Sequence, residues 1–174
     1  MRSKAKAVNF GLAYGQGVFG LSQTLGIPRK EAKEIIDSYF DQFSSIKQFM
    51  ETAVEKARKT GYSITLMGRK RFLRDINSGN HTVRSGAERL AVNSPIQGTA
   101  ADMIKQAMIM VHRRMEKEGF RSRMLLQVHD ELVFDAHKDE VDDLKPLVID
   151  LMQNALPLSI PIVVEAGVGN NWLE

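Results

Sequence analysis

Apolar residues recur every three or four positions through the first sixty residues of the chain, which is the spacing of one face of an α-helix. This periodicity predicts helices over residues 2–14, 28–43 and 45–60. Gly15 and Gly61 follow the first and the third of these segments, and glycine in that position is typical of a helix end. The first third of the chain is therefore predicted to be helical.

Short apolar runs interrupt the helical pattern in the rest of the chain. Runs at 62–66 and 72–73 flank a basic turn, and runs at 124–128 and 132–134 flank an acidic one. Two such runs on either side of a polar turn are typical of a β-hairpin. A last apolar run predicts a strand at 162–166.

Helical spacing returns between and after the two hairpins, over residues 82–93, 99–119 and 139–154. Pro95 and Gly98 are expected to break the helix between the first two of these segments. Thr99, with Asp102 three residues later, resembles a capping box at the start of the next helix. The order of elements predicts an α+β fold with an antiparallel sheet, divided into two lobes at residues 94–98.

The composition excludes several classes of protein. Of the 174 residues, 43% are hydrophobic and 26% are charged, which is typical of a folded chain rather than a disordered one. The absence of cysteine excludes a disulfide scaffold and a cysteine-ligated zinc site, and fits a reducing, cytoplasmic setting. No run approaches the ~18 consecutive apolar residues of a membrane span, so no membrane partner is expected.

The net charge of +3 conceals an unequal distribution. Residues 1–123 hold 22 Lys and Arg against 11 Asp and Glu, a net charge of +11. Residues 124–174 hold 2 against 10, a net charge of −8. The basic part predicts a polyanionic partner, and the acidic part predicts cation binding or structural ion pairs.

Arg2, Lys6, Phe10 and Tyr14 are spaced four residues apart, so they share one face of the first predicted helix. Two cations followed by two aromatic rings would suit a ligand with phosphates at one end and a base at the other, because cations neutralise phosphate oxygens and rings stack on bases. The same spacing also fits a solvated cationic turn followed by two core aromatics, and on spacing alone this second interpretation is the commoner one.

Residues 15–20 match the G-x-G-x-x-G fingerprint of dinucleotide-binding proteins, and Asp37 lies at a suitable distance after them. The fingerprint requires a strand before the glycines and an acidic residue at the end of a second strand. Here the preceding residues have helical spacing, and Asp37 lies in an amphipathic helical segment. We therefore interpret residues 15–20 as a loop between helices rather than as a nicotinamide site.

His129, Asp130 and Glu131 form the acidic turn of the second hairpin. Adjacent carboxylates repel each other, and a divalent cation held by oxygen ligands would relieve that repulsion. An ordinary acidic turn is the alternative. A hydrolytic His-Asp pair is disfavoured because no nucleophile motif accompanies it.

Two further sets of side chains are suited to nucleic acid. Arg89, Asn93 and Gln97 are spaced four residues apart, and amide groups can donate hydrogen bonds to minor-groove acceptors. Helix capping near the expected break is the alternative for this set. The basic turn of the first hairpin contains Arg69, Lys70 and Arg71, and Arg74 follows it. These cations could bind a phosphate backbone, or the turn could simply be solvated.

Taken together, these residues resemble family A DNA polymerases of the bacterial DNA polymerase I type. The segment from Arg2 to Gly15 is similar to the fingers-helix motif of that family, often called motif B, and Gln127 to Glu131 is similar to its motif C. Residues 65–71 and 93–102 match further family motifs in the same order. The resemblance covers essentially the whole chain.

The resemblance implies a helical fingers portion at residues 1–96 and the C-terminal, antiparallel-sheet part of the palm at residues 97–174. The thumb and the first palm segment of the polymerase right hand are not recognisable in this sequence. The partners implied are template–primer DNA, the incoming deoxynucleoside triphosphate (dNTP) and the N-terminal polymerase portion. The implied location is the cytoplasm, associated with the nucleoid.

The resemblance also implies roles for the helical stripe. Arg2 and Lys6 would bind the triphosphate, with Lys6 taking part in catalysis. Phe10 would pack on the base and sugar, and Tyr14 would lie where the templating base stacks. The reaction implied is attack of the primer 3′-hydroxyl on the α-phosphorus with release of pyrophosphate, in DNA replication and repair.

In the same way, Asp130 is implied as a ligand of catalytic Mg²⁺, with Glu131 as a supporting carboxylate. His129 would lie near the primer terminus. The set at 89–97 would contact the template–primer duplex, and the basic turn at 69–71 would contact DNA.

One family motif is missing. The second metal-binding aspartate of the family lies in a motif A of the Asp-Tyr-Ser type, which this sequence does not contain. Two-metal catalysis needs both aspartates. We therefore expect a fragment that is inactive alone, with an open sheet edge prone to self-association. A non-catalytic DNA-binding module is the alternative.

Overall fold

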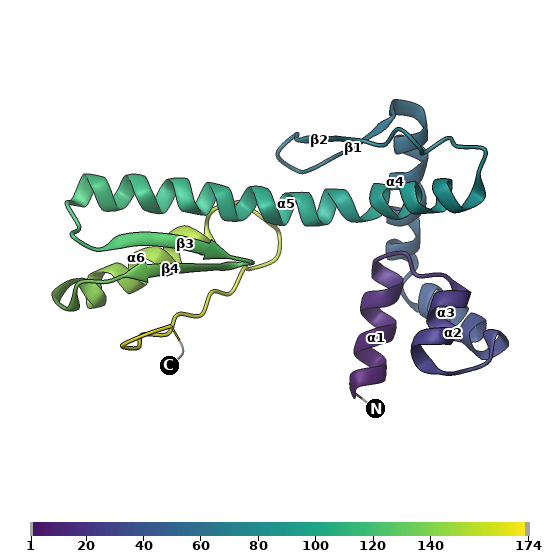
Figure 1. The fold of residues 1–174 in the computed structure, drawn as a ribbon, viewed down its shortest axis with the longest axis horizontal. Helices are drawn as coiled ribbons and strands as arrows, with labels where there is room; N and C mark the ends of the chain where they lie inside the picture. Colours follow the sequence, from purple (N-terminus) through teal and green to yellow (C-terminus); the bar gives the residue numbers. More distant parts are fainter. Residues whose placement is uncertain (1, 173–174) are drawn as a thin grey trace. The chain divides into compact units, whose positions relative to one another are not determined.

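Three helices form the start of the chain in the computed structural model, which describes residues 2–172. They are α1 (Arg2–Ala13), α2 (Val18–Leu25) and α3 (Arg29–Gln42) (Figure 1). Leu12, Leu21 and Ala32, one from each helix, are completely buried where the helices meet. The helices at 2–14 and 28–43 are thereby confirmed.

Helix α2 was not expected, and the prediction of a loop throughout residues 15–20 is wrong from Val18 onward. The helix has only 8 residues, so its apolar positions repeat too few times to show a clear period. Its burial against α1 and α3 supplies the stabilisation that its length does not. The helical conformation of residues 2–13 also removes the strand that a dinucleotide fingerprint requires.

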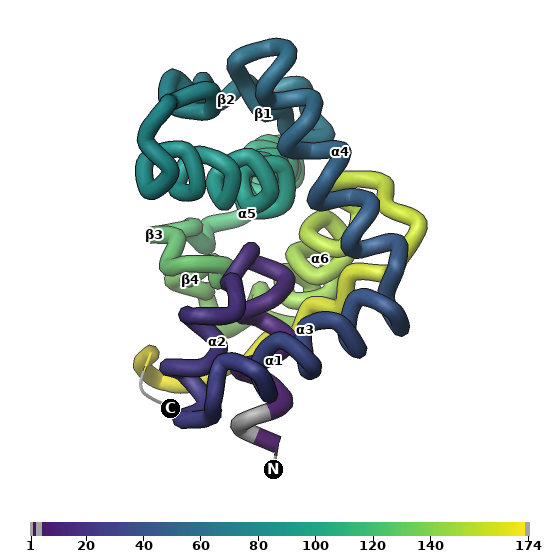
Figure 2. Tube along the Cα trace, turned by 90° about the vertical axis from the view of Figure 1, so that its right-hand side faces the viewer, coloured from purple at the N-terminus to yellow at the C-terminus, as the bar shows by residue number. Residues whose placement is uncertain are grey.

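Helix α4 (Ser44–Thr60) ends at Gly61, whose φ of 77° lies in the left-handed region that glycine adopts at little cost. Strands β1 (Tyr62–Ile64) and β2 (Lys70–Phe72) follow as an antiparallel hairpin, with Tyr62 opposite Phe72. Figure 2 follows α4 from the end of α3 to this hairpin. Both the third predicted helix and the first predicted hairpin are confirmed.

Helix α5 (His81–Glu118) is continuous, so the predicted break at Pro95 and Gly98 is wrong. Proline removes the backbone donor that would pair with the carbonyl four residues earlier. Two hydroxyl groups beside it bond to other carbonyls of the same helix. The Ser94 hydroxyl donates to the carbonyl of Leu90, and the Thr99 hydroxyl donates to that of Pro95 over 2.6 Å.

The predicted capping box at the start of a new helix is also wrong. Thr99 lies in the interior of α5, and Asp102 is buried one turn later with only 3% of its surface exposed. Buried apolar residues lie on both sides of this region, including Ala91, Val92 and Ala107, so packing holds the helix through the proline. None of the described helices carries an apolar stretch long enough to cross a membrane.

Two compact units share the chain, Met1–Thr99 and Ala100–Glu174. In the second, β3 (Arg123–Val128) and β4 (Glu131–Asp135) form an antiparallel hairpin with a register shift between Met124 and Leu126. A 3₁₀ turn, η1 (Lys138–Glu140), leads into α6 (Val141–Gln153). The hairpin and the helix at 139–154 were both predicted. Assignment of the two units to fingers and palm remains a prediction.

The core of the second unit lies between α5, α6 and the β3–β4 hairpin. Val111 and Met115 of α5 contact Leu144 and Val148 of α6, and Phe134 of β4 packs against this cluster. Figure 1 shows α6 lying along one face of the hairpin. This packing holds the base of the hairpin whose tip carries the predicted metal-binding carboxylates.

The predicted strand at 162–166 is wrong, because these residues form neither helix nor strand. A segment forms a β-strand only when it pairs with a neighbouring strand, and β3 and β4 pair with each other in a two-stranded sheet. Val163 is 77% exposed despite its high strand propensity. The α+β class is confirmed, with two separate two-stranded sheets.

Candidate functional site

The predicted stripe lies along an exposed face of α1 and its C-terminal end. Phe10 is 48% exposed and Tyr14 is 40% exposed, so the interpretation of these residues as core aromatics is wrong. Their rings are stacked, with centroids 6.2 Å apart and planes inclined by 26°. The ammonium group of Lys6 lies 5.7 Å from the centroid of the Phe10 ring, and Arg2 is exposed at the helix start. Cation and rings therefore form one solvent-accessible row.

A pocket of about 840 Å³ lies at the Tyr14 end of this row, within the first unit. Its lining brings together members of three predicted sets: Tyr14 from the stripe, Arg71 from the basic turn, and Arg89 with Asn93 from α5. Arg74 lines it as well. The volume is within the ~300–1,000 Å³ range of ligand sites. Three arginines against one carboxylate, Asp75, give the lining a net positive charge, which suits a phosphate ligand.

Asn93 and Arg89 hold the end of α1 from the side of α5. The Asn93 side-chain nitrogen donates to the carbonyl of Tyr14 over 3.4 Å. Its side-chain oxygen is buried and accepts no hydrogen bond from any described residue. Gly15 has a φ of 80°, and a Cβ there would lie 3.2 Å from Cγ of Arg89. Because α5 runs on through this region, capping does not explain these side chains.

Gln97 lies one turn further along α5, exposed and outside the lining of this pocket. The structure therefore places only two of the three residues of the predicted duplex-contacting set at the pocket wall. Gln97 shares their helix but not their contacts.

The β1–β2 hairpin docks on α5 through small residues. A Cβ on Gly98 would lie 2.5 Å from the Thr65 methyl group, so only glycine permits this approach. The Leu66 backbone nitrogen donates to the Thr99 hydroxyl over 3.0 Å. The Thr65 hydroxyl in turn accepts from the backbone nitrogen of Arg69 over 3.1 Å. These contacts position the basic turn and were not expected from the sequence.

The three residues of the basic turn are all exposed. Arg71 lines the pocket, whereas Arg69 and Lys70 do not. The Lys70 ammonium group lies 4.5 Å from the centroid of the Tyr62 ring, a cation–π contact across the hairpin. Arg74, which was predicted to bind phosphate together with the basic turn, also lines the pocket.

The acidic turn lies at the tip of the β3–β4 hairpin in the second unit. His129 and Asp130 form the turn, and Glu131 is the first residue of β4, opposite Val128. His129 has a φ of 54°, in the left-handed region that histidine enters more readily than most residues. The Gln127 side-chain nitrogen donates to its carbonyl. All three predicted residues are exposed, so their side chains are accessible to a ligand.

The donor chemistry of this tip suits a hard divalent cation, because Asp130 and Glu131 both offer carboxylate oxygens. Among residues 2–172, however, no three His, Asp or Glu side chains lie close enough together to hold a metal ion. The carboxylates of the tip could therefore form part of an oxygen ligand set for a divalent cation, but not a complete one among the described residues.

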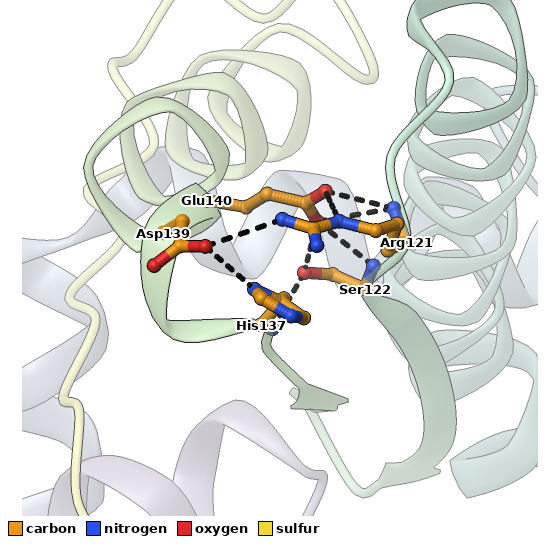
Figure 3. A network of polar contacts seen from close by, with 5 residues as sticks. All are labelled: Arg121, Ser122, His137, Asp139 and Glu140. Atoms are coloured by element: carbon orange, nitrogen blue, oxygen red, sulfur yellow. Dashed lines mark hydrogen bonds and ion pairs between the residues drawn. The ribbon is translucent and has the colours of Figure 1, made fainter.

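At the base of the same unit, a polar network joins the end of α5 to the start of α6 (Figure 3). The Glu140 carboxylate accepts hydrogen bonds from the backbone nitrogens of Arg121 and Ser122 and from the Ser122 hydroxyl, the last over 2.6 Å. The Ser122 oxygen accepts from the backbone nitrogen of His137 over 2.8 Å. Arg121 also pairs with Asp139 over 3.4 Å.

This network explains part of the acidic charge of the second unit. The Ser122 hydroxyl and the Arg121 backbone N–H stabilise the charged carboxylate and lower the pKa of Glu140 to about 2. The hydrogen bond that the Arg121 side chain donates to Glu140 raises the pKa of Arg121. Glu140 and Asp139 therefore act in structural pairing, and the hairpin tip is a separate group of exposed carboxylates.

Known proteins are similar to this chain along its whole length. The sequence model of the family described as DNA polymerase family A matches residues 1–174. DNA polymerase I of Bacillus caldotenax is 49% identical over 174 residues, which are 100% of this chain and 20% of that protein. DNA polymerase I of Mycobacterium bovis is 46% identical over 172 residues, 99% of this chain and 19% of that protein.

A solved structure is similar as well. It is the POL domain of Pol1 from M. smegmatis in complex with DNA primer-template and dNTP, with a TM-score of 0.88 and 48% sequence identity. The match covers 92% of this chain and 28% of that one. The chain spans about one fifth of the length of the curated relatives it matches. From the family match and these identities, the chain belongs to DNA polymerase family A.

Proposed function

We propose that this chain forms the part of a DNA-directed DNA polymerase that binds the incoming dNTP and contacts the template–primer. One observation carries the proposal: the row of Lys6, Phe10 and Tyr14 is exposed on α1 and ends at a pocket lined by arginines. A cation beside an accessible ring suits a ligand that has both phosphate and base. The similar Pol1 domain was solved with DNA primer-template and dNTP, which supports the same ligand classes here.

On the nucleotide side, Lys6 and Arg2 would neutralise phosphate oxygens through charge-assisted hydrogen bonds. Phe10 would pack on the base and sugar, because its ring is accessible and already faces the Lys6 ammonium group. Lys6 would also stabilise charge that develops on the triphosphate during bond formation. Tyr14 would stack on the templating base at the pocket mouth.

On the DNA side, the pocket wall and the basic turn would follow the phosphate backbone. Arg71 and Arg89 line the same pocket as Tyr14, so a strand that places its base on Tyr14 brings its phosphates near both guanidinium groups. Gln97 and His129 would contact the primer–template duplex from α5 and from the hairpin tip, respectively. Arg69 and Lys70 would add non-specific backbone contacts.

Asp130 and Glu131 would hold Mg²⁺ together with ligands from outside this chain. When bound, the metal favours the deprotonated primer hydroxyl and stabilises the attacking and leaving oxygens. The reaction proposed is attack of the primer 3′-oxygen on the α-phosphorus, with pyrophosphate as leaving group. Asp130 contributes through its position at an accessible hairpin tip, and His129 would orient the primer end beside it.

We propose further that the chain alone does not extend primers, because its described residues lack a third carboxylate beside the hairpin tip. Primer extension by the purified chain with Mg²⁺ and all four dNTPs tests this. The expected result is binding of both dNTP and template–primer, without extension. Primer extension that is abolished by Asp130→Ala would contradict the proposal that the catalytic site is incomplete. DNA binding that does not depend on dNTP, with no other activity, would favour a non-catalytic binding module.

A further inference from the structure

The side chain of Gln16 lies in a notch between α1 and α2 that two glycines create. A Cβ built on Gly11 of α1 would lie 2.1 Å from the Gln16 side-chain oxygen. A Cβ built on Gly20 of α2 would lie 2.8 Å from Cγ of Gln16 and 3.1 Å from its side-chain nitrogen. Any larger residue at either position would occupy space that the glutamine now fills.

Hydrogen bonds fix the glutamine at both ends. Its backbone nitrogen donates to the carbonyl of Gly11 over 2.8 Å. Its side-chain nitrogen donates to the Thr24 hydroxyl over 2.8 Å, and that hydroxyl donates to the carbonyl of Gly20 over 3.0 Å. Gln16 thus connects the last turn of α1 to two successive turns of α2.

The position of this notch relates it to the stripe on α1. Gly11 follows Phe10 directly, and Gln16 comes two residues after Tyr14. Glycine is unfavourable inside a helix, yet α1 and α2 each contain one at the point where Gln16 lies. Each helix therefore contains a residue of low helix propensity, and the absence of a Cβ at that residue allows close contact with the Gln16 side chain.

We infer that Gln16 is a positioning residue for nucleotide binding: it holds the last turn of α1, with Phe10 and Tyr14, at a fixed angle to α2. This inference rests on the proposed function of the stripe. Gln16 itself does not belong to the stripe, and neither do Gly11, Gly20 and Thr24, which it contacts. Its effect on the nucleotide acts through the orientation of α1.

The geometry makes an unusual prediction for Gly11→Ala. The atom that the new methyl group would meet is the far end of a flexible side chain, so Gln16 leaves the notch and the backbone stays. Gly11→Ala therefore removes the same contact as Gln16→Ala, although alanine favours the helix. Gln16→Met fills the notch without the amide and is expected to retain most of the function.

The test measures dNTP affinity of the full chain with Mg²⁺ by NMR titration, together with amide hydrogen exchange. Gln16→Ala and Gly11→Ala are each expected to weaken dNTP binding about tenfold, since small displacements of binding groups have large effects. The double variant should be no weaker than either single variant. Gln23→Ala, an exposed glutamine of α2 outside the notch, is the matched control and should leave affinity unchanged.

Hydrogen exchange separates this inference from the proposed function. Amides of residues 10–16 should lose protection in Gln16→Ala, while those of α4 keep theirs, whether or not dNTP binds. If the wild-type chain binds no dNTP but Gln16→Ala still loses this protection, the proposed function is overturned and the contact is supported. Unchanged protection, or additive losses of affinity in the double variant, would overturn the inference.

Discussion

Several residues of this chain have roles that depend on one or two atoms of a neighbour. Gly98 admits the Thr65 methyl group, and the hydroxyls of Ser94 and Thr99 bond to carbonyls around Pro95. The Glu140 carboxylate accepts hydrogen bonds from Arg121 and Ser122. The sequence marks such residues only as small or polar, because their partners lie far along the chain or within a helix that the proline was expected to end.

Glu140 gives a prediction for the pH dependence of stability. Its pKa is about 2 in the folded chain against an ordinary 4.5, so the folded state binds fewer protons in that interval. The stabilisation is present above about pH 5 and is lost as the pH falls toward 2. Urea unfolding should therefore show a smaller loss of stability on acidification for Glu140→Gln than for the wild type.

The matched control is Glu165→Gln, an exposed glutamate of the C-terminal segment. It should retain the acid dependence of the wild type. Equal pH profiles for Glu140→Gln and the wild type would show that the network does not fix the charge of Glu140.

At the scale of elements, the sequence predicted the helices and hairpins whose formation depends on residues close together in the chain. α4 has five turns of clear periodicity and a glycine stop, and its predicted bounds differ from the observed ones by one residue. The continuity of α5 depends on packing on both sides of Pro95, and a strand at 162–166 depends on a pairing partner. Neither condition is visible in the residues themselves.

The docking of the β1–β2 hairpin on α5 can be tested through Gly98 and Thr65. Gly98→Ala forces the hairpin outward and should destabilise the chain by about 1–3 kcal/mol, as overpacking does. Thr65→Ser removes the methyl group that the new Cβ would meet. In that background Gly98→Ala should cost at least 1 kcal/mol less, a coupling of ordinary size for residues in contact.

Denaturant unfolding of the two single variants and the double variant measures this coupling. Gly86→Ala is the control, because a Cβ at that α5 glycine meets no atom within 4 Å. It should be neutral or stabilising. Additive effects of Gly98→Ala and Thr65→Ser would mean that the two residues do not restrict each other.

At the scale of the whole molecule, the basic part and the acidic part of the chain have different proposed functions. The basic part contains the stripe, the pocket and the basic turn, and the acidic part contains the hairpin tip. The four motifs identified the family, which the family match confirms, and the site residues that they suggest remain a prediction. The gathering of Tyr14, Arg71 and Arg89 around one pocket required the fold, because these residues come from separate elements.

The basic part predicts steep salt dependence of DNA binding. About five phosphate contacts, from the turn and the pocket wall, give an expected slope of about −4 in log affinity against log salt. Arg71→Ala and Arg74→Ala should each reduce the slope by about one. Lys145→Ala, an exposed cation of the acidic part, should not change it. Fluorescence anisotropy with labelled primer–template measures the slope, and a flat salt profile would count against this surface.

The most direct measurement of the central claim is dNTP binding to the wild-type chain and to Lys6→Ala, with Mg²⁺ and primer–template present. Loss of one charge-assisted contact to phosphate should weaken binding about tenfold or more. Lys47→Ala, an exposed lysine of α4, controls for net charge and should bind as the wild type does. Equal affinity of the Lys6 and Lys47 variants would contradict the account, as would a wild-type chain that binds no dNTP.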